Sequence, residues 1–156
     1  MIGSSAWTGA GVRVVRREQT VVVGFPVVGP FAELGALVPA AWQRVFARRD
    51  ELPPPVDGAF AELSSYLGDG AYHEVVGVAL PRPPQVPGRW AVAVAPEGEY
   101  AHHRHEGPVE AIGEGFGVLL DAVQAQGRTP GDLKLDVGYR ADGRQGAHDL
   151  YVHLPG

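Results

Sequence analysis

The sequence predicts an α+β fold in which one βαββ unit occurs twice. Residues 27–35 and 105–113 each carry an extended run that ends at Gly-Pro, followed by an apolar residue, a Glu and a second Gly. Residues 58–70 then align without a gap on residues 131–143, and both stretches end at an Asp-Gly turn. Because proline presets the φ angle of a first helical turn, each Gly-Pro indicates a strand that turns into a helix.

The composition narrows the class of protein. With 156 residues, 45% of them hydrophobic and 20% charged, the chain is long enough for one globular domain with its own core. The absence of cysteine excludes disulfides, thiolate nucleophiles and zinc fingers. A net charge of −5 argues against nucleic acid as a partner, because phosphate binding needs clustered Lys and Arg. No apolar run is long enough for a membrane span and no secretion signal is visible, so we expect a cytoplasmic protein.

The first unit begins with a strand and a helix. Residues 1–11 are rich in Gly, Ser and Ala and are expected to form a flexible lead. The many valines of residues 12–24 predict one β-strand, bent near Arg16 to Gln19. Apolar side chains recur every three or four positions across residues 31–48, which predicts an amphipathic helix. Pro39 cannot donate to the carbonyl of Gly35, so we expect the regular helix to begin near Pro39.

A loop, a hairpin and a connector complete the first unit. Pro53 to Pro55 are three consecutive prolines and predict a loop. Residues 60–67 and 71–80 read as two strands around the turn Gly68-Asp69-Gly70. Residues 81–88 hold four prolines and are expected to be a stiff connector between the two units.

The second unit repeats this order of elements. The pattern predicts strands at residues 90–94 and 100–106, a helix from residue 108 to about 126, and a hairpin of residues 133–139 and 149–154. Gly127 is in the position expected for a helix end. We therefore expect a single domain over residues 12–156, with its repeats at about 12–80 and 89–155.

Several motifs, taken in order, resemble those of the GyrI-like small-molecule-binding family. They are the helix segment at residues 40–46, Gly77 in the first hairpin, Gly98-Glu99-Tyr100-Ala101 running into His105-Glu106-Gly107-Pro108, and the closing residues 150–152. The same domain, with its SHS2-like duplication related to SOUL proteins, serves as the effector-binding part of AraC-type and MerR-type regulators. The resemblance covers about residues 12–154. It implies a curved antiparallel sheet with two main helices on one face and a ligand cleft between the halves.

Two carboxylates are candidates for a site in that cleft. The resemblance implies an acidic residue in the third strand of the second unit, where Asp136 is the nearest match; the alternative is a solvated strand residue. Glu74 occupies a hairpin position where the family often carries an aromatic facing the cleft. A carboxylate among the apolar neighbours of Glu74 would be costly unless satisfied. Glu74 also aligns with Asp149 in the repeat, so both can instead be exposed edge charges.

Aromatic residues on regular elements are the other candidates for ligand binding. Trp42 and Phe116 lie on the apolar stripes of their helices and fit a core role equally. Tyr66 and Tyr139 are repeat partners at strand ends, which suits either two cleft walls or two turn-capping tyrosines. Each ring that stacks on a flat cation contributes on the order of 0.5 to 2 kcal/mol. The predicted aromatic binding residues are Trp42, Tyr66, Tyr72, Trp90, Phe116, Tyr139 and Tyr151.

The sequence offers no metal or cofactor site. His103 and His105 share one face of a strand while His102 points away, and two imidazoles do not close a metal site. No Gly-rich phosphate loop or Gly-x-Ser-x-Gly elbow occurs in the expected context, so no cofactor is expected.

Three functions remain open. The leading hypothesis, implied by the resemblance, is a stand-alone domain that senses or sequesters a bulky, lipophilic, often cationic aromatic molecule, with no nucleic acid or membrane partner, as a monomer or homodimer. The rival is a hydrolase that opens cyclopropanoid DNA-alkylating natural products. Glu74 or Asp136 would then position the water and Tyr139 or Tyr66 would steady the leaving phenolate. The third is an interaction protein that inhibits a larger enzyme.

Overall fold

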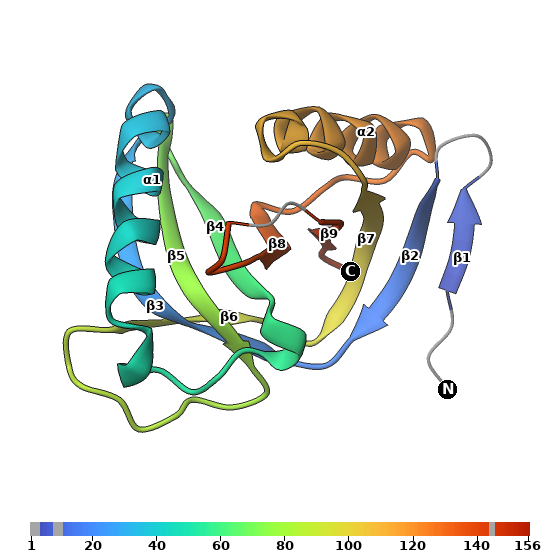
Figure 1. Cartoon of the computed structure of the whole chain (residues 1–156). Helices are drawn as coiled ribbons and strands as arrows, with labels where there is room; N and C mark the ends of the chain where they lie inside the picture. The colour runs from blue at the N-terminus through green and yellow to red at the C-terminus, as the bar shows by residue number, and fades with distance from the viewer. Residues whose placement is uncertain (1–3, 8–10, 144–145) are drawn as a thin grey trace.

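The structure is a computed structural model that describes residues 4–7, 11–143 and 146–156, with the side chains of residues 4–7 left out (Figure 1). It confirms an α+β fold with one sheet and two helices. The strands are β1 (Ser4–Trp7), β2 (Val12–Arg17), β3 (Thr20–Pro30), β4 (Phe60–Gly68), β5 (Ala71–Leu80), β6 (Ala91–Ala95), β7 (Gly98–His105), β8 (Leu133–Tyr139) and β9 (His148–Leu154). The helices are α1 (Phe31–Ala47) and α2 (Ile112–Ala125), with short 3₁₀ turns η1 (Arg49–Glu51), η2 (Val56–Gly58) and η3 (Val109–Ala111).

The described strands form one antiparallel sheet in the order β1-β2-β7-β9-β8-β4-β5-β3-β6. The two halves meet where β4 pairs with β8. Outward from this pair, β5, β3 and β6 on one side correspond to β9, β7 and β2 on the other. β6 precedes β7 in the chain but pairs with β3, while β2 precedes β3 but pairs with β7. Each half therefore has an outer strand that comes from the other half.

Both helices lie on one face of the sheet, as the resemblance implied. Glu62 is directly opposite Asp136, and Asp136 is directly opposite Leu150, so these three side chains share a face. Helix α1 packs on β3, β4 and β5 through Trp42 and Val45, whereas α2 packs on β2, β7 and β9. Figure 1 shows α1 along the half that holds β3 and β5, and α2 over the half that holds β7.

The opposite face is also buried, because the curved sheet brings strands of both halves together there. Leu63 of β4, Leu135 of β8 and Tyr100 of β7 belong to one cluster with neighbours from β3, β5 and β6. The Tyr100 hydroxyl is satisfied by donating to the carbonyl of Pro96 at 2.6 Å. The two halves therefore share one core and are joined by more than the connector at residues 81–88.

Two expectations for the first half, one for its first strand and one for its helix, differ from the structure. The single strand expected at residues 12–24 is two strands, because a bend at Glu18 and Gln19 sends β2 to β7 and β3 to β5. Helix α1 begins at Phe31 and not near Pro39, since Pro30 supplies the helix start and Pro39 lies on the exposed side, where water can reach the freed carbonyl.

Part of the expected flexible lead is a strand. Residues 4–7 pair with β2, whose outer edge would otherwise leave backbone groups without partners. Residues 1–3 and 8–10, also in that lead, lie outside the described residues. The remaining elements match their predicted ranges to within about two residues, apart from the start of the second helix, where η3 precedes α2. No helix in the described part of the chain has the length and apolar character needed to cross a membrane.

A glycine pair allows the tight approach of β3 and β5. Gly24 lies opposite Gly77. A Cβ on Gly24 would lie 1.8 Å from the carbonyl oxygen of Val76, and one on Gly77 would lie 2.0 Å from that of Val23. No side chain fits at either position, so the curvature of the first half depends on this pair.

Candidate functional site

Both predicted acidic residues and two of the predicted aromatics, Trp42 and Tyr139, meet where the two halves join. Trp42 comes from α1, Glu62 and Glu74 from β4 and β5, and the remaining members from β8 and β9. We name this group the acidic cluster, and its members are Trp42, Glu62, Glu74, Asp136, Tyr139 and His148. It lies on the face of the sheet that carries both helices.

The first part of the acidic cluster is a pair of glutamates. Glu62 is hydrogen-bonded to Glu74, whose side chain is buried. Burial, this hydrogen bond and the charges of Glu74 and Asp136 raise the pKa of Glu62 well above its ordinary value, although a hydrogen bond from Trp42 lowers it. That bond runs from the indole Nε1 to the Glu62 Oε1 over 3.3 Å. Glu62 therefore keeps a proton at pH values where a solvated glutamate has lost it.

The second part is a buried aspartate and histidine. The Nδ1 atom of His148 lies 2.6 Å from the Oδ1 atom of Asp136, and both side chains are almost wholly buried. Burial raises the pKa of Tyr139, as do the charges of Glu62 and Asp136 and a hydrogen bond with Asp136. The Tyr139 hydroxyl thus stays protonated and donates to Asp136. Asp136 holds the imidazole and the phenol in fixed positions.

Two aromatic rings cover these polar groups. The rings of Trp42 and Tyr139 lie 4.5 Å apart with an interplanar angle of 33°. The Tyr139 ring also meets the His148 ring edge-on at 4.7 Å, and Phe60 meets Trp42 edge-on at 6.4 Å. Aromatic surface and carboxylates are therefore side by side, which is the combination that attracts an organic cation.

Gly138 determines how Tyr139 reaches this position. The pairing of β4 with β8 shifts by one residue here, since Phe60 pairs with Tyr139 but Ala61 pairs with Val137. A Cβ on Gly138 would lie 2.7 Å from the Cγ atom of His148, so only glycine lets β9 approach. Gly138 thus makes room for His148, and the register shift turns the next side chain toward the helices.

A cavity lies beside the acidic cluster and between the halves. It has a volume of about 600 Å³ and reaches Phe60, the ring that flanks Trp42. One side is formed by Leu52 and neighbouring loop residues of the first half, and the other by Arg140 to Asp142 of the second half. Its size falls within the usual range for small-molecule pockets.

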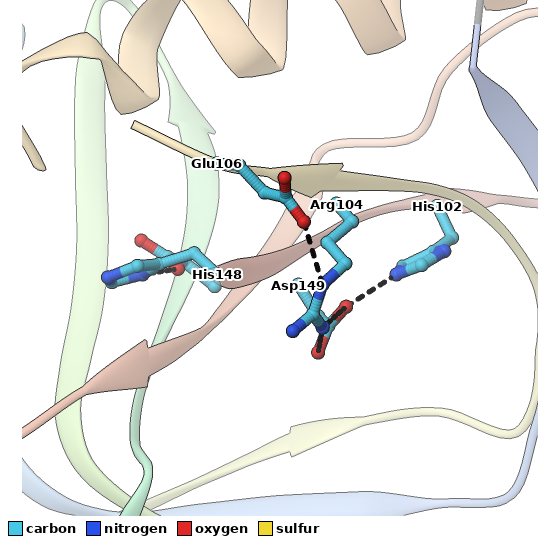
Figure 2. Close-up of polar contacts among 6 residues, drawn as sticks. His102, Arg104, Glu106, His148 and Asp149 are labelled. Atoms are coloured by element: carbon cyan, nitrogen blue, oxygen red, sulfur yellow. Dashed lines mark hydrogen bonds and ion pairs between the residues drawn. The ribbon is translucent and has the colours of Figure 1, made fainter. Parts of the chain in front are cut away.

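Three predicted site residues form the centre of the acidic cluster. Glu74 and Asp136 are each only 4% exposed, so neither is the solvated or edge charge that the sequence left open. Asp149, the repeat partner of Glu74, instead points to the other side of β9, where it meets His102 and Arg104 (Figure 2). The third residue is Tyr139, whose ring packs against those of Trp42 and His148.

Other predicted aromatics lie outside the cluster. Tyr66 is exposed and its hydroxyl accepts a hydrogen bond from the Gly70 amide over 3.0 Å, so it caps the β4–β5 turn. Tyr72 is beside it, with ring centroids 5.1 Å apart. Tyr151 faces the opposite side of the sheet, where the Arg17 guanidinium lies 4.1 Å from its ring centroid. The acidic cluster touches none of these three rings in the contacts between described residues.

Trp90 and Phe116 have structural partners. Trp90 is buried in the core under α1, and its indole donates to Glu51 over 3.0 Å. Phe116 packs in the core under α2, with the Lys134 Nζ atom 5.9 Å from its ring centroid. Phe116 therefore has the core role that its helix periodicity offered as an alternative. Trp90 is a core residue as well.

The sequence analysis missed Glu62 and His148. The alternation of β4 already placed Glu62 on the same face as Phe60, which was a usable signal. Its significance comes from Asp136 on the neighbouring β8, and sequence alone did not identify that strand as its partner. His148 was hidden because the repeat alignment matched Glu74 to Asp149. Among the described residues, no group of three or more His, Asp or Glu side chains is arranged to hold a metal ion.

Solved structures of the same architecture exist although sequence comparison finds none. No protein-family model and no curated protein matches the chain. An integron cassette protein from the mobile metagenome of Vibrio cholerae superimposes with a TM-score of 0.71 at 14% identity, covering 93% of this chain and 96% of that one. The structure of SAV2435 bound to tetraphenylphosphonium gives a TM-score of 0.71 at 11% identity, covering 93% and 94%. The chain has the GyrI-like fold.

A solved structure with a lower TM-score is described as an enzyme. It is a hydrolase encoded by lin2189 from Listeria innocua, with a TM-score of 0.53 at 11% identity over 94% of this chain and 92% of that chain. Identities this low establish the fold alone. Only the chain's own acidic cluster therefore bears on its function.

Proposed function

We propose that the chain binds a bulky, lipophilic aromatic cation at the acidic cluster, and so senses or sequesters such compounds. The observation that carries the proposal is the meeting of three acidic side chains, Glu62, Glu74 and Asp136, beneath the rings of Trp42 and Tyr139. Cation–π contact contributes about 0.5 to 2 kcal/mol per ring, depending on how far the ring is desolvated. The SAV2435 structure, which carries tetraphenylphosphonium on the same fold, supports this class of ligand.

The protonated Glu62 suits such a ligand. Without a ligand, its proton offsets the repulsion between neighbouring carboxylates. A bound organic cation would supply that positive charge instead, so the proton leaves as the ligand enters. The ionised Glu62 carboxylate then offsets the free energy lost when the cation leaves water. The neighbouring cavity of about 600 Å³ offers an entrance for the ligand at Phe60.

Calorimetric titration with tetraphenylphosphonium tests the proposal. We expect saturable one-to-one binding by the unaltered chain and at least about tenfold weaker binding by Glu62→Gln and by Trp42→Phe, a loss of about 1.4 kcal/mol. Glu33→Gln is the matched control, since Glu33 is an exposed acid on α1, and it should bind like the parent. No saturable binding, or equal affinities for Glu62→Gln and Glu33→Gln, would refute the proposal.

The acidic cluster also favours a second function, hydrolysis of a cyclopropanoid DNA-alkylating compound. The supporting observation is the contact between His148 and Asp136, which leaves the imidazole held in one orientation beside the Tyr139 ring. Water would be positioned by Glu74 or Asp136. Its oxygen bonds to a cyclopropane carbon as the ring C–C bond breaks. The electron pair passes to the conjugated carbonyl, and the proton that the water loses passes to that carboxylate and then to the resulting phenolate. The Tyr139 hydroxyl steadies the phenolate by turning its hydrogen bond from Asp136 to it.

Product analysis separates the two functions. Incubation with such a compound should give the adduct of one water molecule, and His148→Gln should abolish it. His73→Gln, on the opposite face of β5, should retain it. If the unaltered chain forms no adduct above buffer but binds tetraphenylphosphonium, the chain is a binder and not a hydrolase.

A further inference from the structure

A second cavity, with the opposite charge, lies under the end of α1. It has a volume of about 350 Å³ and five lining residues: Phe25, Arg44, Arg48, Arg89 and Trp90. None of these belongs to the acidic cluster. They come from β3, from the last turns of α1 and from the segment before β6, so this cavity is built by the first half and its connector. We name it the arginine cavity.

The arginine cavity has more positive than negative groups. The Arg44 guanidinium lies 4.9 Å from the centroid of the Phe25 ring and, within the described residues, forms no ion pair. Arg48 and Arg89 both pair with one carboxylate, that of Glu51. The lining therefore holds three guanidinium groups and no acidic side chain, in a chain whose net charge is −5.

Glu51 fixes the walls of this cavity and does not fill it. Its carboxylate accepts hydrogen bonds from Arg89 and, over 3.0 Å, from the Trp90 indole. Partial burial raises the pKa of Glu51, but these hydrogen bonds and the charges of Arg89 and Arg48 outweigh that effect and leave the pKa lowered. The carboxylate thus stays ionised and holds the Trp90 ring in place. Arg44 remains available for a ligand.

These features indicate one class of ligand. A guanidinium fork matches a carboxylate in shape and charge, and it also stacks on flat rings. The rings of Phe25 and Trp90 offer such stacking surface beside the guanidinium groups. We propose that the arginine cavity binds a small aromatic carboxylate, with the acid group on Arg44 and Arg48 and the ring against Trp90 or Phe25. This site is independent of the cation site proposed above.

Titration with 2-naphthoate tests this proposal. We expect saturable one-to-one binding to the full chain by calorimetry, and at least tenfold weaker binding of neutral 2-naphthol and of inorganic phosphate. Arg44→Gln should weaken 2-naphthoate at least tenfold. Arg16→Gln is the matched control on β2, because Arg16 pairs with Glu97 as Arg48 pairs with Glu51 and is similarly exposed, at 52% against 58%.

The outcomes separate the two proposed sites. Arg44→Gln that loses 2-naphthoate but binds tetraphenylphosphonium like the parent supports an independent arginine cavity. Equal binding of 2-naphthol and 2-naphthoate, or equal effects of Arg44→Gln and Arg16→Gln, overturns it. Phosphate that binds as tightly as 2-naphthoate would also overturn it, since the rings would then contribute nothing. Arg48→Gln is a second variant that should weaken 2-naphthoate in the same direction.

Discussion

Glu62 is the residue whose environment departs most from that of a solvated side chain of its type. It lies on β4, where the two halves of the sheet meet, beside two other acids and beneath an indole that donates to it. Its raised pKa is a property of folding, because an unfolded chain would return the carboxyl to water. The raised pKa of Glu62 therefore reduces stability at neutral pH, which is consistent with the binding role proposed for the acidic cluster.

The raised pKa of Glu62 predicts how stability depends on pH. Above the ordinary pKa of glutamate, the folded chain still holds a proton that the unfolded chain has released. The free energy of unfolding should therefore fall as pH rises from about 4.5 toward the folded-state pKa, by at most about 1.4 kcal/mol per pH unit. Urea denaturation across this range should show the fall in the unaltered chain and a flatter profile in Glu62→Gln. Parallel profiles would mean that Glu62 ionises normally in the folded chain.

At the scale of elements, the strands that carry the site are shaped by glycines. Gly138 leaves room for His148 beside β8. The facing residues Gly24 and Gly77 let the paired strands β3 and β5 approach closely. Strand positions could be read from apolar alternation and turn residues, which is why both hairpins were predicted nearly to the residue. The bend near Glu18 and Gln19 was expected, but the division into β2 and β3 was not, because it depends on which strand lies beside each half of the segment.

Gly77 provides a direct test of the close approach of β3 and β5. Gly77→Ala puts a methyl group against the Val23 carbonyl, with no flexible atom to yield, so we expect a loss of about 1 to 3 kcal/mol or more. Gly35→Ala is the control, since Gly35 is exposed on α1 with open space around it and should gain up to about 1 kcal/mol. Thermal unfolding of both variants measures the difference. A Gly77→Ala variant as stable as the parent would mean that β3 and β5 can separate without cost.

On the scale of the whole molecule, the exchange of outer strands joins the halves into one unit. The shared core on the face opposite the helices includes residues from both halves, among them Leu63 and Leu135. Fold class, both helices and six of the nine described strands, β4 to β9, were predictable, since each depends on local pattern. The composition of the site was only partly predictable. Glu74, Asp136, Tyr139 and Trp42 were named, but Glu62 and His148 gain their meaning from contacts across β4, β8 and β9.

Because the halves share a core, we expect them to unfold together. In a Trp7→Phe background the fluorescence comes from Trp42 and Trp90, both in or next to the first half, whereas far-ultraviolet circular dichroism reports on the whole sheet. The two signals should give the same denaturation midpoint in urea. A fluorescence midpoint clearly separated from the dichroism midpoint would show that the first half unfolds on its own.

The pairing of β2 with β7 and of β6 with β3 has a consequence for how such a chain can arise. A gene that encoded only one repeat, with its leading strand, would make a protein unable to close its own sheet. Two copies of that protein would have to trade leading strands in a symmetric dimer, and gene fusion would convert the dimer into a monomer without breaking a contact. In such a fusion, the proline-rich segment at residues 81–88 would be the joint between the two copies. An excised repeat is thus expected to survive only as a dimer.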